Sequence, residues 1–373
     1  AVTLSKKARA RAVQLPAWNE ALGLPRPWDQ QWSMRMQQIM AFETDLLEYE
    51  DLFDGNQVVD AKVESLKTSA RYELETIEAQ GGALNAIEYM KSRLVESNTN
   101  RLQNIESNHT TVVGVNKFTN TEKSPLVSGD GGIMVVDPSV EKDQIDRLNL
   151  WRRKRDEKLV NKALFNLRKA ASDGQNIMPA SIEAAKAGAT TGEWALEMRN
   201  IYGEYRGPTG VAMGISNKTD GLDELRSAVD AVSDKLGERL KFLIGKPGLD
   251  GHSNGAEQIA SRARDCGMKI EYEGIRLTPQ ELVETVKSTR AHVIGLSILS
   301  GSHIPLVQDM ITLLAKEGLT KIPIVVGGII PEEDKAKLLK MGISKVYTPK
   351  DFEMNTIMMD IVNLAEPTEI AAE

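Results

Sequence analysis

The sequence predicts an α/β protein whose C-terminal part forms an open, parallel sheet. From about residue 239 onward, short apolar segments alternate with amphipathic segments of helical periodicity. The expected strands are 240–244, 270–273, 293–298, 322–326 and 345–347, and the helices between and after them begin near Asn254, Pro279, Ile304, Pro331 and Asp351. Five strand–helix units of this kind predict a parallel sheet with helices on both faces.

This arrangement is flavodoxin-like, and we expect it to span residues 236–373. The same fold serves flavin-binding proteins and response regulators, so it assigns no function by itself. A response regulator needs an acidic cluster at its strand ends, and a flavodoxin needs a Ser/Thr-rich phosphate loop after its first strand. Here the strand ends carry Gly245-Lys246, Ser297 and Gly327-Gly328, and the first loop contains Asp-Gly-His. Neither of those two classes is therefore favoured.

The first part of the chain, residues 1–118, predicts a different architecture. Its expected elements are a strand at 12–15, a helix capped by Ser33 that extends through Leu47, and helices at 63–81 and 83–95. Strand-then-helix units of this kind fit the last part of a (β/α)8 barrel, although they do not prove one.

A largely helical linker is expected at residues 119–235. Turn signals come first, and a helical pattern dense in charge follows from 138 to 171. Its charged run at 152–158 predicts a solvated helix face. Two further amphipathic segments occupy 178–203, and the second begins near Thr191 with Glu193 in its first turn.

Composition limits the possible functions and compartments. The 373 residues suffice for two or more domains, and no apolar run approaches the roughly 20 residues of a membrane helix. A net charge of −7 argues against a nucleic-acid-binding face. The single cysteine, Cys266, excludes an internal disulfide, is expected to be packed, and fits the cytoplasm. The four histidines show no pair at zinc-ligand spacing. Because the chain begins abruptly at Ala1, we expect it to start inside a longer protein.

One loop, Gly245-Lys246-Pro247-Gly248-Leu249-Asp250-Gly251-His252-Ser253-Asn254-Gly255, carries the most informative chemistry. It leaves the carboxyl end of a strand, where open parallel sheets bind ligands. The imidazole of His252 could bind a metal through one ring nitrogen while Asp250 holds the other, and Lys246 could anchor that carboxylate. The glycines would let a bulky group approach the backbone. Taken alone, however, the Asp-x-His-x-x-Gly spacing favours an ordinary flexible turn by about two to one.

Two further segments change those odds. Asp250-x-His252-x-x-Gly255, then Ser297-x-Leu299, then Gly327-Gly328 together resemble the cobalamin-binding domain of the methionine synthase and methylmalonyl-CoA mutase superfamily. The resemblance implies that His252 replaces the dimethylbenzimidazole of the cofactor as the lower cobalt ligand. It also implies that the displaced nucleotide tail enters a pocket beside the sheet. The implied cofactor-binding residues are Lys246, Asp250, Gly251, His252, Gly255, Ser297, Leu299, Gly327, Gly328 and Thr348.

The remainder of the chain resembles the same superfamily. Residues 19–25 and 113–118 are similar to the end of an acyl-CoA mutase barrel. Four segments are more similar to the ethylmalonyl-CoA mutase branch than to the methylmalonyl-CoA branch, namely 27–32, 47–51, 202–210 and 297–303. The resemblance covers about residue 10 to about residue 365, which is nearly the whole chain.

The resemblance implies an adenosylcobalamin-dependent isomerase that rearranges an acyl-CoA by a radical mechanism. The substrate would be ethylmalonyl-CoA, or methylmalonyl-CoA and succinyl-CoA, and we also expect a homodimer. The substrate-side Tyr and His of the family are expected upstream of Ala1, so no catalytic residue is assigned; Gln14, Glu48 and Glu50 lie near expected strand ends without an assigned role. Two alternatives stay open: a cobalamin-binding subunit or corrinoid carrier without its own barrel, and a non-enzymatic flavodoxin-like sensor.

Overall fold

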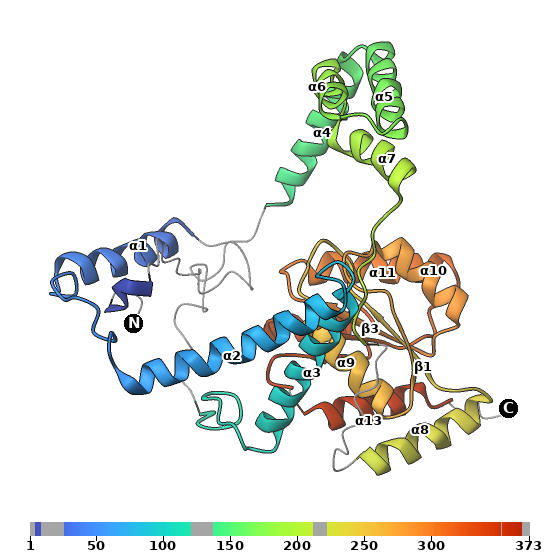
Figure 1. Ribbon diagram of the computed structural model, residues 1–373. Coiled ribbons are helices and arrows are strands. Elements are labelled where there is room, and N and C mark those ends of the chain that lie inside the picture. Colours follow the sequence, from blue (N-terminus) through green and yellow to red (C-terminus); the bar gives the residue numbers. More distant parts are fainter. Residues whose placement is uncertain (1–3, 9–25, 121–136, 212–221, 352, 368–373) are drawn as a thin grey trace. The chain divides into compact units, whose positions relative to one another are not determined.

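The computed structural model describes residues 4–8, 26–120, 137–211, 222–351 and 353–367 (Figure 1). The chain forms two compact units, one made of Ala1–Met134 with Pro208–Glu373 and the other of Val135–Gly207. Among the described helices, none is long and apolar enough to cross a bilayer. The first unit contains the sheet and the predicted cofactor loop.

The sheet has five strands, all parallel, in the order β2-β1-β3-β4-β5. The strands are β1 (Lys241–Gly245), β2 (Lys269–Tyr272), β3 (Val293–Ile298), β4 (Ile324–Gly328) and β5 (Lys345–Tyr347). The strand order reverses between β1 and β3, so the loops that follow these two strands meet at one crevice. The predicted flavodoxin-like sheet is confirmed.

Helices cover both faces of the sheet (Figure 1). On one face Phe242 and Ile244 of β1 pack with α8 (Leu222–Leu236), α9 (Asn254–Asp265) and α13 (Met354–Ala365). On the other face Leu243 packs with α10 (Pro279–Thr289), α11 (His303–Lys316) and α12 (Glu332–Lys340). Helix α8 falls within the expected linker, but it packs against α13 and contributes to this core. Cys266 ends α9 and is fully buried, as expected.

Some element boundaries differ from the expected ones by a few residues. Strand β4 begins at Ile324 rather than at residue 322, since Pro323 has no N–H for the ladder and offers only its carbonyl to Ile294. Pro331 is the N-cap of α12 rather than a residue of its first turn. Helix α13 begins at Met354, not near Asp351, because the Asp351 carboxylate closes a turn on the N–H of Thr348.

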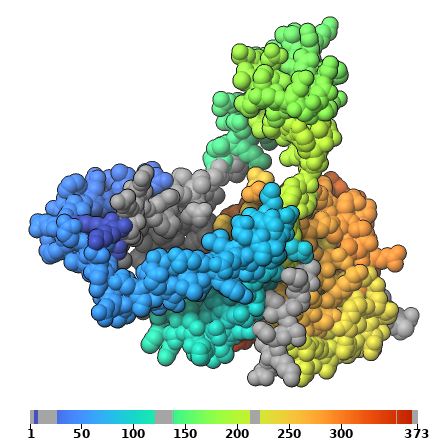
Figure 2. Space-filling model, viewed as in Figure 1, coloured from blue at the N-terminus to red at the C-terminus, as the bar shows by residue number. Residues whose placement is uncertain are grey.

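The described part of the N-terminal segment contains a short 3-10 helix (Lys6–Ala8) and three α-helices, α1 (Pro27–Phe42), α2 (Gln57–Ala79) and α3 (Ile87–Glu106). The prediction that Ser33 caps a helix extending through Leu47 is wrong, because α1 begins at Pro27 and ends at Phe42. Helix α2 also begins earlier than expected, where the Asn56 side chain accepts hydrogen bonds from two backbone N–H groups. It has no buried residue, and Figure 2 shows it on the molecular surface. The expected strand at 12–15 and Gln14 lie outside the described residues.

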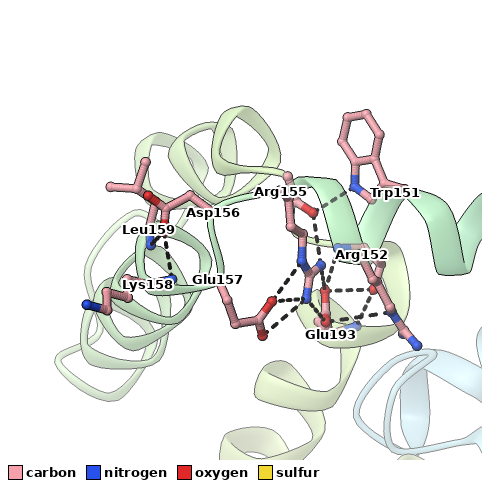
Figure 3. Close-up of polar contacts among 10 residues, drawn as sticks. Trp151, Arg152, Arg155, Asp156, Glu157, Lys158, Leu159 and Glu193 are labelled. Atoms are coloured by element: carbon pink, nitrogen blue, oxygen red, sulfur yellow. Dashed lines mark hydrogen bonds and ion pairs between the residues drawn. The ribbon is translucent and has the colours of Figure 1, made fainter.

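The second unit consists of α4 (Pro138–Lys154), α5 (Glu157–Ser172), α6 (Met178–Ala187) and α7 (Thr191–Tyr202), at the positions where helices are expected. The predicted solvated face at 152–158 is wrong for Arg155, whose side chain is only 6% exposed. Its guanidinium nitrogens lie 2.6 and 2.7 Å from the two carboxylate oxygens of Glu193 (Figure 3). This contact lowers the pKa of Glu193 to about 2. Arg155 and Trp151 also donate to the Gly188 carbonyl, so the start of α7 and the end of α6 are tied to α4.

Candidate cobalamin site

The loop after β1 is built around a buried ion pair. The Lys246 ammonium lies 2.8 Å from Asp250 Oδ2, and the two side chains are 1% and 7% exposed. The same ammonium donates to the Ser297 carbonyl at the end of β3, at 3.3 Å. A buried lysine requires such partners because a charge without them is costly in a protein interior. Lys246 therefore fixes the Asp250 carboxylate at the crevice between β1 and β3.

Asp250 in turn orients His252. One carboxylate oxygen, Oδ1, lies 2.7 Å from the ring Nδ1 of His252 and accepts the backbone N–H of the same residue at 3.0 Å. An ionised carboxylate only accepts hydrogen bonds, so Nδ1 carries a ring proton, and in the neutral imidazole Nε2 is then the nitrogen with the lone pair. The His252 side chain is 74% exposed. The outward-facing imidazole thus has the tautomer of a metal ligand.

The ionisation of Asp250 follows from its contacts. Burial by itself raises the pKa of this carboxyl, but the hydrogen bonds from Lys246 and His252 outweigh it, and the pKa lies well below its usual range. The Leu299 N–H also donates to Oδ2, at 3.3 Å. Asp250 is therefore a carboxylate at any physiological pH, and it joins the loop after β1 to the loop after β3.

Backbone contacts hold the loop in place from a second side. The Leu277 N–H donates to the Lys246 carbonyl, and the Gly248 N–H donates to the Leu277 carbonyl, at 3.2 and 2.9 Å. Gly248 has φ +88°, and a Cβ at this position would lie 3.0 Å from Leu306. Only glycine fits this turn without strain, so the loop reaches Asp250 along one defined path.

The glycines expected to accommodate the nucleotide tail lie beside Ser297 in the sheet. Ser297 pairs with Gly327, and Ile298 pairs with Gly328. A Cβ on Gly328 would lie 1.9 Å from the Ile298 carbonyl oxygen, so packing between β3 and β4 already requires this glycine. A Cβ on Gly327 would meet only Tyr347, at 3.8 Å. The sheet itself therefore requires glycine at position 328 but would tolerate a Cβ at position 327.

The structure places the other predicted residues along the same edge of the sheet. Gly251 and Gly255 are exposed, and nothing lies within 4 Å of a Cβ added at Gly255. Leu299 is half-buried beside Asp250. Thr348 follows β5 and is 7% exposed, and its hydroxyl donates to Asp351. The structure therefore gives Thr348 a role in a turn, and its contact with a cofactor stays a prediction.

Two residues near this edge have no site role in the sequence-based prediction. Arg276 adopts a left-handed backbone with φ 62°, and its Nη2 would lie 3.6 Å from a Cβ on Gly251. His303 begins α11, is 3% exposed, and places Nε2 2.9 Å from Asp334. The resemblance at 297–303 includes His303, but no spacing rule signals either contact, because both partners are distant in sequence.

This geometry suits a site in which the protein supplies one metal ligand and a cofactor supplies the others. The described residues contain no group of three or more His, Cys, Asp or Glu side chains that could hold a metal ion. A single imidazole with its other nitrogen held by a carboxylate suits a site where one protein side chain binds the metal. Where a cofactor supplies the remaining ligands, His252 would be the residue of this chain that holds the metal.

The chain is similar to known acyl-CoA mutases. Residues 8–204 match the family model for methylmalonyl-CoA mutase, and residues 240–350 match that for the B12 binding domain. The chain is 66% identical over all 373 residues to an ethylmalonyl-CoA mutase of Cereibacter sphaeroides and 56% identical over 369 residues to one of Methylorubrum extorquens. It is 29% identical over 346 residues to the methylmalonyl-CoA mutase of Cereibacter sphaeroides.

The alignments include 100%, 98% and 91% of this chain, and 57%, 53% and 48% of these three relatives. The chain thus spans about half the length of the relatives it matches. Its mutase-family segment and its B12-binding segment follow one another in the same chain, and the first of them alone covers more than half of the residues. The chain belongs to the methylmalonyl-CoA mutase family.

Proposed function

We propose that this chain is part of an adenosylcobalamin-dependent acyl-CoA mutase that converts ethylmalonyl-CoA to methylsuccinyl-CoA. The observation that carries the proposal is the arrangement of Lys246, Asp250 and His252, which presents an imidazole lone pair at the crevice of a B12-binding domain. The preference for ethylmalonyl-CoA is supported by 66% identity to an ethylmalonyl-CoA mutase, against 29% to a methylmalonyl-CoA mutase.

Each residue of the loop would have a separate role in holding the cofactor. When bound, adenosylcobalamin supplies a cobalt–carbon bond that can break homolytically. His252 would hold cobalt through Nε2, and Asp250 would keep the proton on Nδ1. Lys246 would keep Asp250 ionised and in place. The edge at Ser297 and Gly327 would accommodate the displaced nucleotide tail.

An assay of the longer polypeptide that contains this chain tests the substrate. The purified protein is loaded with adenosylcobalamin and offered ethylmalonyl-CoA and methylmalonyl-CoA separately, and products are identified by mass spectrometry. The expected result is methylsuccinyl-CoA from ethylmalonyl-CoA, with slower or no conversion of methylmalonyl-CoA. Conversion of methylmalonyl-CoA alone would overturn the substrate assignment, and conversion of neither would overturn the mutase.

The alternative of a cobalamin-binding subunit is supported by the match of residues 240–350 to the B12 binding domain. Uptake of cobalamin by the 373-residue chain, with no mutase activity in the longer polypeptide, would support it.

The proposal also includes a homodimer and a cytoplasmic location. The dimer rests on the family resemblance and is tested by sedimentation velocity. The location rests on the buried, unpaired Cys266.

A further inference from the structure

Helix α9 is attached to α3 by polar contacts, close to the proposed cobalt ligand. Helix α9 begins at Asn254, two residues after His252. Helix α3 lies in the segment that matches the mutase family model. The two helices contact each other within the first compact unit. Helix α3 is therefore connected, through α9, to the loop that carries His252.

The first contact is an ion pair between Lys91 and Glu257. The Lys91 ammonium lies 2.7 Å from Glu257 Oε1, and the two side chains are 27% and 3% exposed. Glu257 is in the first turn of α9. Burial, and then the charge of Glu257, raise the pKa of the nearby Tyr272 phenol. A carboxylate this deeply buried depends on its cation, because its loss would leave an uncompensated charge.

Two more contacts continue along the same helix faces. The Gln258 side chain accepts from the Thr99 hydroxyl at 3.0 Å and donates to the Val95 carbonyl at 3.3 Å. Glu106, at the end of α3, accepts from Arg262 at 3.2 Å and from the N–H of Met354 in α13 at 3.1 Å. These contacts fix the register of α3 against α9, and Lys91 is the contact nearest to the His252 loop.

Gly210 lies close to the backbone of Lys91. It has φ +72°, and a Cβ here would lie 2.8 and 2.9 Å from the Lys91 carbonyl carbon and oxygen. The next residue, Val211, enters the core of the sheet domain. Gly210 is also the last residue of the 202–210 segment that resembles the ethylmalonyl-CoA mutase branch. The chain at Gly210 thus packs closely against the backbone of Lys91.

We propose that Lys91 is a positioning residue for the cobalt ligand. Through Glu257 it fixes the first turn of α9, and through that turn it fixes the path of the loop from Asp250 to Ser253. This inference rests on the proposed function, because the loop matters only if His252 binds cobalt. Lys91 itself touches neither cobalt nor substrate in this scheme.

The test compares three variants of the full chain with the unaltered protein. Lys91→Met removes the cation but keeps most of the side-chain length, and Lys91→Arg keeps the charge. Lys287→Met is the matched control, because Lys287 forms a 2.6 Å ion pair with Glu317 and lies in the last turn of α10, at the opposite end of its helix from the cofactor edge. Amide hydrogen exchange without cofactor is measured over residues 248–257, and cob(II)alamin binding is then measured on the same samples.

In Lys91→Met, exchange over 248–257 should become roughly tenfold faster, with the rest of the sheet domain unchanged. Cobalamin affinity should fall on the order of tenfold, as for loss of other groups that orient a metal ligand. Lys91→Arg should restore both values, and Lys287→Met should change neither. If Lys91→Met does not fold, two other variants replace it. The single variant Glu257→Gln should lose protection from exchange over 248–257, and the charge-swapped double variant Lys91→Glu/Glu257→Lys should recover it.

Unchanged exchange over 248–257 in Lys91→Met would overturn the inference, as would an equal change in Lys287→Met. A failure of the double variant to recover protection, if it is used, would also count against it. Failure of the unaltered chain to bind cobalamin would instead overturn the proposed function. The exchange measurement contains no cofactor, so these two failures are distinguishable.

Discussion

Lys246 Nζ and Asp250 Oδ2 form a buried ion pair, 2.8 Å apart, and the other oxygen of the same carboxylate contacts the imidazole of His252. Lys246→Met should leave the Asp250 carboxylate without its cation, and breaking a buried pair in this way costs about 3–5 kcal/mol. We expect a fall of that size in the free energy of unfolding, measured with urea. A loss below about 1 kcal/mol would mean that the pair is not buried in solution.

Glu193 gives a prediction for the helical unit. Because its folded pKa of about 2 lies below the ordinary value of 4.5, its contribution to stability is complete above about pH 4.5 and is lost as the pH falls towards 2. Glu193→Gln should therefore destabilise this unit on the order of 2 kcal/mol at pH 7. The difference between the variant and the unaltered protein should shrink steadily below pH 4.5 in thermal unfolding. A difference independent of pH would contradict the bond with Arg155.

Gly328 and Gly255 should respond in opposite ways to the same substitution. Gly328→Ala forces a Cβ against the Ile298 carbonyl in a backbone with φ 141°, and should cost about 3 kcal/mol or prevent folding. Gly255→Ala meets no atom within 4 Å and lies in α9, so stability should hold or rise by about 0.5 kcal/mol. If the corrin ring of bound cobalamin lies close to Gly255, the Gly255→Ala variant should bind cobalamin more weakly than the unaltered chain, even though its stability is not reduced. Equal stability changes in the two variants would contradict the geometry.

Cys266 should be unreactive in the folded chain. Burial raises the pKa of its thiol to about 11, so little thiolate exists at pH 8. A thiol reagent should label it only after denaturant is added, and the labelling rate should follow unfolding. Rapid labelling of the native chain would show that the end of α9 opens.

The sequence predicts local patterns here better than contacts between distant segments. Residues 293–298 are a mostly apolar run, and this strand forms as expected. The short strand at 345–347, Lys-Val-Tyr, also forms at its expected position, with Val346 buried. The start of α2 differs because its cap is a single side chain, Asn56, which hydrophobic periodicity does not register. Arg155 lies in a charged run that resembles a solvated face, and only the fold brings Glu193 to it.

The contacts at the candidate site also separate into local ones, which the sequence predicts, and long-range ones, which it does not. Lys246, Asp250 and His252 lie within one loop, so their spacing predicts their contacts, and the structure brings them together. The pairing of Lys91 with Glu257 joins two helices that are far apart in the chain. No local pattern signals such a contact, because it depends on how α3 packs on α9.

The account depends on His252 as the cobalt ligand, and electron paramagnetic resonance of bound cob(II)alamin tests this most directly. The unaltered chain should show coupling between cobalt and a histidine nitrogen, and His252→Ala should lose that coupling together with much of the affinity. Asp250→Asn should keep the coupling but weaken binding on the order of 10–100-fold. Histidine-nitrogen coupling that persists unchanged in His252→Ala would contradict the account.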